Sequence, residues 1–382
     1  MKLLFVSNLF PDTAEPYRGL DNACLLHSLS RDCEIRVIAT RPGLPFKKDS
    51  PKACREIDRK FQPQYLKTLY VPKVGSRFNH HLFARAIREP LLSLKKDFEY
   101  DIILCAWLFP DATAVALLQT ELKVPFVAIA QGSDAHAYLR MPARRRIIVD
   151  AMNRSSGVIT RSAKLTQLLE EAGVEQGKAQ PVYNGVDLEL FCPGDKQAEK
   201  KALGLPNTPL ILFIGNFVPV KNPLLLIQAH AQLCEQVPST LVMIGGGPME
   251  GEAREFANKA GFGNDVILAG RKSSAEIARY MRAADVLCLS SENEGVPNVI
   301  LEAFASGVPV VSTNVGGIAE VVNSEFLGTL VERGNAKELS SALAKTLLAK
   351  PAVEKIRAHG LTFSWERSAR QYLEILRNAV RK

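Results

Sequence analysis

The sequence has no apolar run long enough to cross a membrane, because no window of about 18 residues is both apolar and uncharged. The first residues, MKLLFVSNLFPDTAEP, contain a short apolar run without a small-residue cleavage site, so we expect no secretory signal. These absences predict a cytoplasmic protein. A place at the inner face of the cell membrane is compatible with them.

Cysteine is scarce. The seven cysteines are an odd, scattered set without a Cys-x-x-Cys pair. Such a set suits reduced thiols in the core and excludes a regular disulfide framework or a zinc-finger pattern. We therefore predict neither disulfides nor a zinc site.

The 382 residues exceed what one hydrophobic core usually organises, so we expect two domains. The net charge of +8 is unevenly placed: residues 1–188 hold 27 Lys and Arg against 20 Asp and Glu, and residues 189–382 hold 21 against 20. The first half therefore carries nearly all of the excess. Such a half can attract nucleic acid, an anionic membrane or a phosphorylated substrate.

Short runs rich in β-branched residues and leucine alternate with helical patterns along the chain. This alternation is typical of βαβ units and parallel sheets, and the near-continuous apolar character indicates sheets covered by helices on both faces. The expected strands lie within residues 2–8, 33–40, 101–107, 125–130, 157–162, 210–216, 241–246, 265–270, 285–290 and 308–313.

The alternation stops between residues 183 and 209, where glycine, proline and charged residues interrupt it. We place a domain boundary there, with domains at 1–188 and 189–364. The fold class is α/β, with two Rossmann-like parallel-sheet domains facing a cleft and ligands bound at the carboxyl ends of the strands.

The last segment, 365–382, predicts a helix that could cap either domain and that we assign to the first. Its apolar positions at helical spacing are Trp365, Ala369, Tyr372, Leu373, Leu376 and Val380.

Two glutamates flank a turn in the segment SSENEGVPNVILEAFASGVPVV, residues 290–311. Pro297 suits the first turn of a helix that ends at Gly307, and Glu294 lies in the loop before it. Asn298 and Glu302, four residues apart, share the side away from the core. A loop carboxylate, turn amides and a helix carboxylate can bind a polyhydroxylated ligand, although two ordinary exposed glutamates would give the same pattern. The apolar stripe of this helix is Val299, Ile300, Ala303 and Phe304.

Lys221 stands just before Asn222, a good N-cap, and Pro223, a good first helical residue. A lysine at this place adds its charge to the positive end of a helix, which is how proteins hold phosphates. Asn216 lies in the same loop. A solvated lysine at a helix start is the simpler alternative.

Three glycines end the expected strand in LVMIGGGPMEGEA and allow a ligand to approach the backbone closely. The dinucleotide fingerprint is absent, because counting from Gly245 gives Gly247 and then Glu250 where the third glycine belongs. The sequence therefore argues against a nicotinamide-dependent dehydrogenase.

These motifs, GNFVPVKN, IGGGP, the segment from GRKSSAEI to GGIAEVV, and the earlier YNGVDLELFCP, together resemble family 4 of the retaining, nucleotide-sugar-dependent glycosyltransferases. The resemblance covers essentially the whole chain and is strongest from Tyr183 to Val322, where several motifs keep the family's order and spacing. It implies the GT-B fold. It also implies transfer of a hexose-type sugar from a nucleoside diphosphate to a glycan or lipid-linked acceptor, in polysaccharide or glycolipid synthesis. UDP is the favoured carrier and GDP the second choice.

The resemblance implies roles for individual residues. Glu294 would hold hydroxyls of the donor sugar, Lys221 the diphosphate, and Glu302 the ribose hydroxyls. The other donor-binding positions that the resemblance suggests are Gly19, Asn216, Gly246, Arg271, Gly295, Val296, Pro297 and Asn298.

No Asp-x-Asp motif, which holds a divalent metal in many other glycosyltransferases, occurs in the sequence. We therefore expect no metal and no cofactor, with Lys221 and helix ends taking the metal's place at the phosphates. Many relatives carry Arg where this chain has Asn216, so a second cation is lost. Arg271 could compensate for it.

In the first half, AQGSDAH resembles a family motif that often has His at the position of Gln131. An amide cannot act as a general base, so Gln131 can contribute hydrogen bonds only. Asp134 is a further catalytic candidate, with a helix-capping role as the alternative. The family's retaining mechanism needs no enzymic nucleophile, because the departing phosphate can take the acceptor's proton.

The basic first half should hold the acceptor. The stretch from 71 to 96 combines apolar residues with basic ones, and Arg144, Arg145 and Arg146 follow. A basic amphipathic helix suits contact with an anionic membrane, and an ordinary surface helix packed on its own domain suits the sequence equally well. We expect no nucleic acid partner, because no binding motif accompanies the charge. The residues concerned are Arg77, Phe78, Leu82, Phe83, Arg85, Ile87, Arg88, Lys95 and Lys96.

Three alternatives remain open at this point. A glycoside hydrolase would use Glu294 and Glu302 as its acid and base. A nucleotide-sugar epimerase would convert the donor without an acceptor. A catalytically silent nucleotide-sugar binding protein would tolerate the changes at Asn216 and Gln131.

Overall fold

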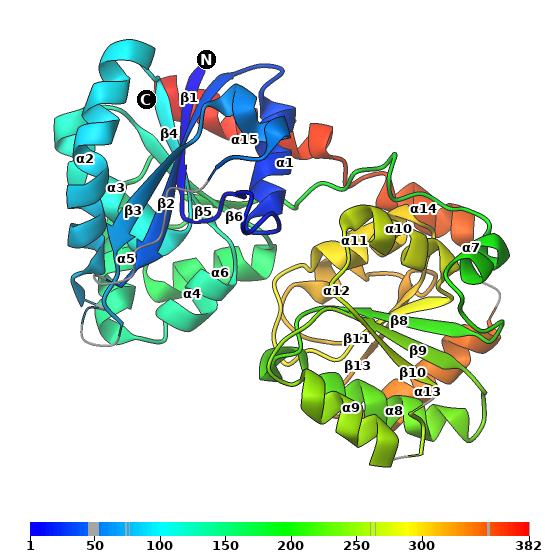
Figure 1. The fold of residues 1–382 in the computed structure, drawn as a ribbon. Coiled ribbons are helices and arrows are strands. Elements are labelled where there is room, and N and C mark those ends of the chain that lie inside the picture. Colours follow the sequence, from blue (N-terminus) through cyan, green and yellow to red (C-terminus); the bar gives the residue numbers. More distant parts are fainter. Residues whose placement is uncertain are drawn as a thin grey trace. The chain divides into compact units, whose positions relative to one another are not determined.

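The computed structural model describes residues 1–44, 53–72, 75, 77–259, 261–263, 265–349 and 352–381. The chain divides into two compact units, Met1–Asn184 with Trp365–Lys382, and Gly185–Ser364 (Figure 1). The boundary that we expected between residues 188 and 189 lies just inside the second of these units. Of the expected C-terminal helix, Lys382 lies outside the described residues.

The N-terminal unit is built on a seven-stranded sheet in the order β3-β2-β1-β4-β5-β6-β7, and its described pairs are parallel. Val6 of the central strand is aligned with Ile38 on one side and Cys105 on the other. The strands are β1 Lys2–Ser7, β2 Glu34–Gly43, β3 Gln64–Leu69, β4 Ile102–Ala106, β5 Phe126–Ala130, β6 Gly157–Thr160 and β7 Ala179–Pro181.

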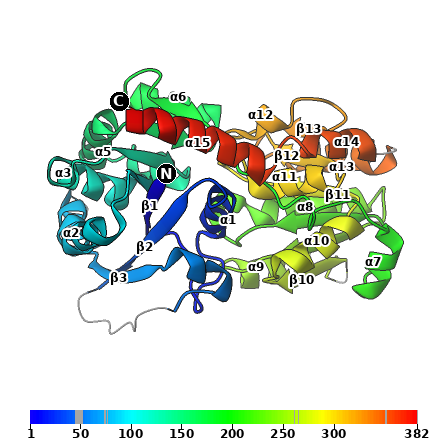
Figure 2. The same ribbon diagram turned by 90° about the horizontal axis from the view of Figure 1, so that it is seen from above.

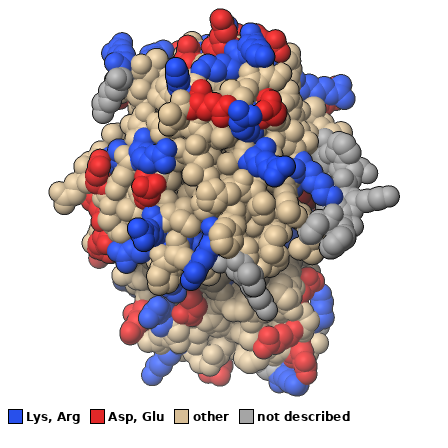
Figure 3. Space-filling view, turned by 90° about the vertical axis from the view of Figure 1, so that its left-hand side faces the viewer, with Lys and Arg blue, Asp and Glu red and all other residues tan. Residues whose placement is uncertain are grey.

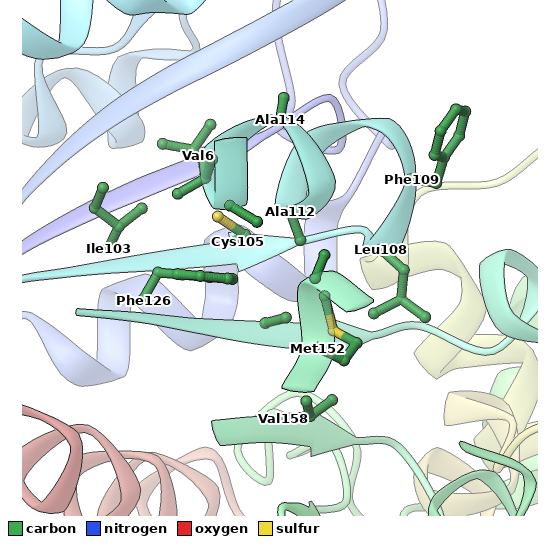
Figure 4. Packing of buried hydrophobic residues seen from close by; sticks show 14 of the residues in the cluster. Val6, Ile103, Cys105, Leu108, Phe109, Ala112, Ala114, Phe126, Met152 and Val158 are labelled. Atoms are coloured by element: carbon green, nitrogen blue, oxygen red, sulfur yellow. The ribbon is translucent and has the colours of Figure 1, made fainter. Parts of the chain in front are cut away.

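Helices cover both faces of this sheet. Successive side chains of each strand point to opposite sides, so each face has an apolar cluster of its own. Leu4 and Val6 belong to one apolar cluster, shown in part in Figure 4, and Leu3 and Phe5 to the other. The helices of this unit are α1 Leu20–Leu29, α2 Asn79–Phe98, α3 Thr113–Leu122, α4 Ser133–Tyr138, α5 Pro142–Arg154, α6 Ala163–Ala172 and α15 Trp365–Arg381, with a short 3₁₀ turn at Glu56–Phe61 and a π turn at Leu108–Ala112.

The C-terminal helix α15 contacts α1, and Figure 2 shows it in red within the N-terminal unit. Its Tyr372, Leu373 and Leu376 are buried in the same apolar cluster as Leu3 and Phe5. One expected position of its apolar face is wrong. Val380 is 41% exposed, and the neighbouring Ala379 is buried instead.

The C-terminal unit has a six-stranded sheet in the order β10-β9-β8-β11-β12-β13, again with parallel pairs. Its strands are β8 Leu210–Ile214, β9 Thr240–Ile244, β10 Val266–Gly270, β11 Val286–Leu289, β12 Val310–Thr313 and β13 Gly328–Val331. Its helices are α7 Lys196–Ala202, α8 Pro223–Cys234, α9 Glu250–Lys259, α10 Ser274–Ala283, α11 Asn298–Ala305, α12 Ile318–Val321, α13 Ala336–Leu348 and α14 Val353–Gly360, with a 3₁₀ turn at Pro219–Lys221.

The two sheets share one topology, which confirms the predicted pair of Rossmann-like parallel sheets. In each unit the first strand is central, the next two lie on one side of it, and the fourth and later strands lie on the other. The direction of winding therefore reverses between β1 and β4 and between β8 and β11, where ligands of such sheets usually bind. No helix of the described ranges combines the length and the apolar character that a membrane span requires.

Candidate functional site

The most distinctive polar group of the C-terminal unit lies where the winding of its sheet reverses. β8 and β11 are neighbours, with Leu212 aligned to Leu287. Lys221 ends the 3₁₀ turn after β8, and Glu294 lies in the loop after β11. The carboxyl ends of two adjacent parallel strands thus bring together residues that are far apart in the sequence.

Lys221 and Glu294 form an ion pair, with 2.5 Å between Nζ and Oε1. The hydroxyl of Ser291 donates to the same carboxylate oxygen at 2.6 Å. The lysine side chain is 26% exposed and the glutamate side chain 9% exposed. Both charges are therefore fixed in position, and the ammonium group remains accessible to a ligand.

The loop after β11 is tied to the loop after β8. The backbone N–H of Glu292 donates to the carbonyl of Val220 at 2.8 Å, and the Glu292 carboxylate accepts from the amide of Asn222 at 2.7 Å. The Ser290 hydroxyl lies 3.0 Å from the Lys221 carbonyl and 2.8 Å from that of Asn222. These contacts hold the backbone of the lysine while its side chain points to Glu294.

The loop after β12 supports Glu294 from its other side. Gly316 has a left-handed φ of 58°, and a Cβ there would lie 1.8 Å from the Glu294 carbonyl oxygen. The N–H of Gly317 donates to the Gly295 carbonyl at 3.0 Å, and the Thr313 hydroxyl to the Ser291 carbonyl at 2.6 Å. These supporting residues were not among the predicted site residues. Their signal was the TNVGG run that follows the expected strand.

The helix after Glu294 differs slightly from the expected one. α11 begins at Asn298, with Pro297 as its N-cap in an extended conformation. Gly295, Val296 and Pro297 form the connecting loop, so their backbone groups lie next to Glu294 in the chain.

The apolar stripe of α11 needs one correction. Val299 is half-buried, and Leu301 takes its place among the buried residues Ile300, Leu301, Ala303 and Phe304. The buried face of this helix is broader than one stripe at three- and four-residue spacing, so it includes Leu301 next to Ile300.

Glu302 lies on α11, half-buried by surface area but closely surrounded by protein. Burial raises the pKa of its carboxyl to about 7. Among the described residues no hydrogen-bond donor contacts that carboxylate. Glu302 is therefore a half-buried acceptor whose hydrogen-bonding capacity the described chain leaves unused.

The predicted start of α8 is confirmed. Asn222 is the N-cap, its side chain accepts from the N–H of Leu225 at 3.3 Å, and Pro223 is the first helical residue. Lys221 precedes this helix end directly. Its charge thus adds to the positive end of the helix dipole.

The glycine run after β9 packs against the loop after β8. Cβ atoms at Gly245 and Gly247 would lie 1.8 Å from the Gly215 carbonyl oxygen and 2.5 Å from the Phe217 carbonyl oxygen. Only glycine permits so close a backbone approach at these places. Gly246 is buried between them.

Two further donor candidates lie in neighbouring loops. Arg271 follows β10, and its Nε is 3.4 Å from the place of a Cβ at Gly246. Asn216 follows β8 and is exposed. Arg271, Gly246 and Asn216 thus follow three adjacent strands at one edge of the sheet.

Gln131, in the N-terminal unit, has both ends of its amide engaged. Its Nε2 donates to Oδ1 of Asn22 at 2.8 Å, and its Oε1 accepts from Nε of Arg161 at 3.2 Å. Arg161 is 4% exposed and also donates to the Tyr372 hydroxyl at 2.8 Å. This network fixes the orientation of the Gln131 side chain.

Asp134 is fully buried and accepts four backbone N–H bonds, one from Leu108 at 2.9 Å and three at 3.0 Å from Gln131, Gly132 and Ala135. Burial raises the pKa of its carboxyl to about 6, although the four N–H groups act in the opposite direction. The geometry is that of a residue that shapes the loop around Gln131.

Gly19 is the N-cap of α1, with a left-handed φ of 63°.

The described basic residues of the N-terminal unit differ in their surroundings: Arg77, Arg85 and Arg146 are exposed, whereas others are paired or buried. The apolar side of α2, with Phe83 and Ile87, is buried in the core of its own unit, while Phe78 is 61% exposed. Arg88 pairs with Glu121, and Arg144 is 6% exposed. On the face that Figure 3 shows, Lys and Arg are interspersed with Asp and Glu.

Family models match both parts of the chain. The model described as "Glycosyl transferases group 1" matches residues 195–361, and the model described as "Glycosyltransferase Family 4" matches residues 25–190. The chain belongs to the group 1 and family 4 glycosyltransferases. The expectation from the sequence motifs is confirmed.

Curated relatives of this glycosyltransferase include proteins named D-inositol 3-phosphate glycosyltransferase. The protein of Mycolicibacterium paratuberculosis is 31% identical over 292 residues, which cover 72% of this chain and 64% of that protein. The protein of Saccharomonospora viridis is 30% identical over 293 residues, which cover 72% and 67%. The matched part thus spans less than two thirds of the first relative's length.

Solved structures confirm the GT-B fold. The HepE protein of Anabaena in complex with UDP has a TM-score of 0.78 and 21% identity, with 99% of this chain and 100% of that chain covered. Sucrose-phosphate synthase of Thermosynechococcus elongatus has a TM-score of 0.79 and 20% identity, with 99% and 98% covered.

Proposed function

We propose that this glycosyltransferase moves a hexose-type sugar from a UDP-sugar to a glycan or lipid-linked acceptor, with retention of the anomeric configuration. The observation that carries the proposal is the Lys221–Glu294 pair at the carboxyl ends of β8 and β11. HepE has been solved with UDP and with UDP-glucose, which supports UDP as the carrier. A GDP-sugar is the second choice.

In the proposed donor site, Lys221 binds the diphosphate. Its partly exposed ammonium group and the start of α8 supply positive charge without a deep desolvation penalty. Glu294 accepts from hydroxyls of the sugar, and the loop from Gly295 to Asn298 provides polar backbone groups beside it. When the donor binds, Lys221 exchanges its contact with Glu294 for the anionic phosphate oxygens, and Glu294 exchanges its contact with Lys221 for the sugar hydroxyls.

Glu302 accepts from the ribose hydroxyls. Its half-buried carboxylate has no donor among the described residues, and a ribose diol would supply two. Gly246 and the neighbouring glycines let the donor lie against the backbone, with Asn216 and Arg271 at the phosphates.

Breaking the sugar–phosphate bond adds negative charge to the leaving diphosphate, so fixed cations and amide dipoles stabilise the transition state. We infer that Lys221 and helix dipoles do this without a metal ion. The leaving phosphate takes the proton of the attacking hydroxyl on the same face of the sugar. No enzymic base is needed, which agrees with the presence of Gln131 in place of a histidine.

The N-terminal unit holds the acceptor in this proposal, and Gly19 and Gln131 are the residues of this unit that we assign to donor binding and to catalysis. Asp134 is a positioning residue, because its carboxylate accepts from the backbone N–H of Gln131 and so fixes that backbone. Any contact with an anionic membrane would use exposed basic side chains of α2, since the apolar side of that helix is buried.

A thermal-shift screen against UDP-, GDP- and ADP-sugars tests the donor assignment. A ligand at 100 times its dissociation constant adds about 2.7 kcal/mol to the free energy of unfolding. We expect a UDP-sugar to give the largest shift and to be hydrolysed slowly or transferred. Conversion of the donor sugar without an acceptor would indicate an epimerase, and tight binding without any turnover a silent binding protein.

A further inference from the structure

Arg144 is a buried cation for which the described chain provides no counter-ion. Its side chain lies on α5 and is 6% exposed. Among the described residues no carboxylate pairs with it, and its Nε has no hydrogen-bond partner. A charge removed from water without an opposite charge is costly, so the protein must gain something from this arrangement.

Aromatic rings and one hydroxyl surround the guanidinium group. Its Cζ lies 4.4 Å from the centre of the Tyr138 ring and 5.0 Å from that of Phe109. One terminal nitrogen donates to the hydroxyl of Tyr70 at 3.3 Å. Stacking on rings offsets part of the desolvation cost and holds the guanidinium plane in place, but it leaves donors of the group free.

A second unpaired polar atom lies on the same ring of Phe109. His80, 6% exposed, has its ring centre 5.7 Å from that of Phe109, and its Nδ1 is buried without a partner. Burial lowers the pKa of His80 to about 4, so the imidazole is neutral near pH 7 and can donate one hydrogen bond. Two buried polar nitrogens around one ring thus lack partners within the described part of the chain.

The cluster lies where a ligand of this sheet is expected. Tyr70 directly follows β3, Trp107 directly follows β4, and Tyr138 ends the helix after β5. These three aromatic side chains are half-exposed, whereas Arg144, which contacts Tyr70 and Tyr138, is buried. A ligand that approaches Arg144 from the carboxyl ends of the strands would meet these aromatic side chains first.

We propose that Arg144 binds a phosphate ester carried by the acceptor, with Tyr70 and His80 as further donors and Trp107 and Tyr138 as stacking surfaces for its carbohydrate. The guanidinium fork matches two oxygens of a phosphate group, and the anion neutralises the buried charge. The phosphate belongs either to a soluble sugar phosphate or to a lipid-linked acceptor. This proposal rests on the proposed function, in which the N-terminal unit holds the acceptor.

The direct test is phosphate binding, measured in the full chain with the Lys221→Ala substitution so that the proposed donor site does not contribute. Inorganic phosphate is titrated while ¹⁵N–¹H spectra follow the arginine Nε–H signals. We expect the Arg144 signal to shift downfield as its unpaired Nε–H gains an acceptor. Affinity should fall at least about tenfold when Arg144→Gln is added, since a buried charge contact is lost.

Matched variants separate binding from folding. Arg146→Gln removes an exposed arginine of the same helix and should leave phosphate affinity unchanged. Arg144→Lys keeps the charge and should restore part of the affinity. An Arg144 signal that does not respond to phosphate overturns the proposal, and so does equal loss of binding in the Arg146 variant.

Two probes distinguish the sources of the phosphate. Glucose 6-phosphate represents a soluble ester, and phosphatidylcholine vesicles with undecaprenyl phosphate represent a lipid-linked one; glucuronate tests a carboxylate in place of phosphate. Binding that depends on Arg144 for one phosphate probe assigns the source, and preference for glucuronate overturns the phosphate assignment. Failure of UDP-sugars to bind the wild-type protein would instead contradict the proposed function, because that measurement does not involve Arg144.

Discussion

The two units have the same order of their first strands, but the polar groups at the place where the winding of each sheet reverses differ in burial and in charge. In the N-terminal unit, Asn8 after β1 donates to Asp111 after β4 at 2.5 Å, and Thr40 donates to the other oxygen of Asp111 at 2.7 Å. All three side chains are buried. In the C-terminal unit the corresponding place holds the partly exposed pair Lys221–Glu294.

The difference shows that this topology fixes where polar groups meet and leaves their use open. Buried Asp111, whose pKa is raised to about 6 by burial, serves to join strands of its sheet. Lys221 keeps its charge within reach of solvent. At the same place in the fold, the N-terminal unit thus has a buried hydrogen-bond network around Asp111, and the C-terminal unit has the partly exposed charge of Lys221.

The largest expected effect is that of Lys221→Ala. Loss of this cation should raise the transfer barrier by about 2.7–4 kcal/mol, as for other donors aimed at developing negative charge, which lowers kcat/KM by roughly 100- to 1,000-fold. The fold should be retained, because the Glu294 carboxylate, which is 9% exposed and loses its cation, keeps the hydrogen bond from the Ser291 hydroxyl. Steady-state transfer assays and melting curves measure the two quantities.

Lys196→Ala is the matched control for that experiment. Lys196 forms an ion pair of the same length, 2.5 Å, with Asp285, which lies just before β11 and so at the opposite end of the sheet. We expect this variant to keep its kcat/KM. Equal losses of activity in the two variants would show that removing any lysine pair disturbs the sheet.

Glu302→Gln should make the C-terminal unit more stable at alkaline pH. The pKa of Glu302 is about 7 in the folded protein and about 4.3 in unfolded chains, so the folded state binds the proton more tightly. The stability that this group contributes is complete below the unfolded pKa and is lost as the pH rises through 7. Glutamine avoids that loss, which amounts to about 1–3 kcal/mol at pH 8.

Calorimetry at pH 5 and pH 8 checks this prediction, because the stabilisation should appear at pH 8 and shrink at pH 5. The same variant should bind a UDP-sugar more weakly, since one acceptor oxygen is replaced by a donor. A wild-type protein whose C-terminal transition does not depend on pH in this range would contradict the assigned pKa.

The sequence predicted the interior strands of both sheets and missed β3, β7 and β13. These three strands lie at sheet edges. Edge strands are less completely buried, so QYLKTL, AQP and GTLV lack the continuous apolar character that identified the others. The edge strand β10 was nevertheless predicted, because its run VILAG is continuously apolar. The local pattern therefore failed only at edge strands that contain polar or charged residues or are very short.

The candidate site shows a similar division. The N-cap Asn222 with Pro223 could be predicted because capping depends on adjacent residues. The Lys221–Glu294 ion pair and the hydrogen bond from Gln131 to Asn22 join residues 73 and 109 positions apart, which no local pattern specifies. The pKa of Glu302 likewise depends on burial by other elements.

The smallest expected effect is that of Asn222→Gly. The N-caps of α1 and α8, Gly19 and Asn222, both have a left-handed φ, 63° and 44°. Glycine adopts this conformation without strain and is a fair N-cap, so we expect a loss of a few tenths of a kcal/mol in urea unfolding. Asn222→Ala should cost about 1 kcal/mol or more, because alanine neither caps the helix nor favours a positive φ. Equal losses in the two variants would mean that the side-chain hydrogen bonds of Asn222, with Leu225 and Glu292, and not the backbone conformation, determine the residue at this position.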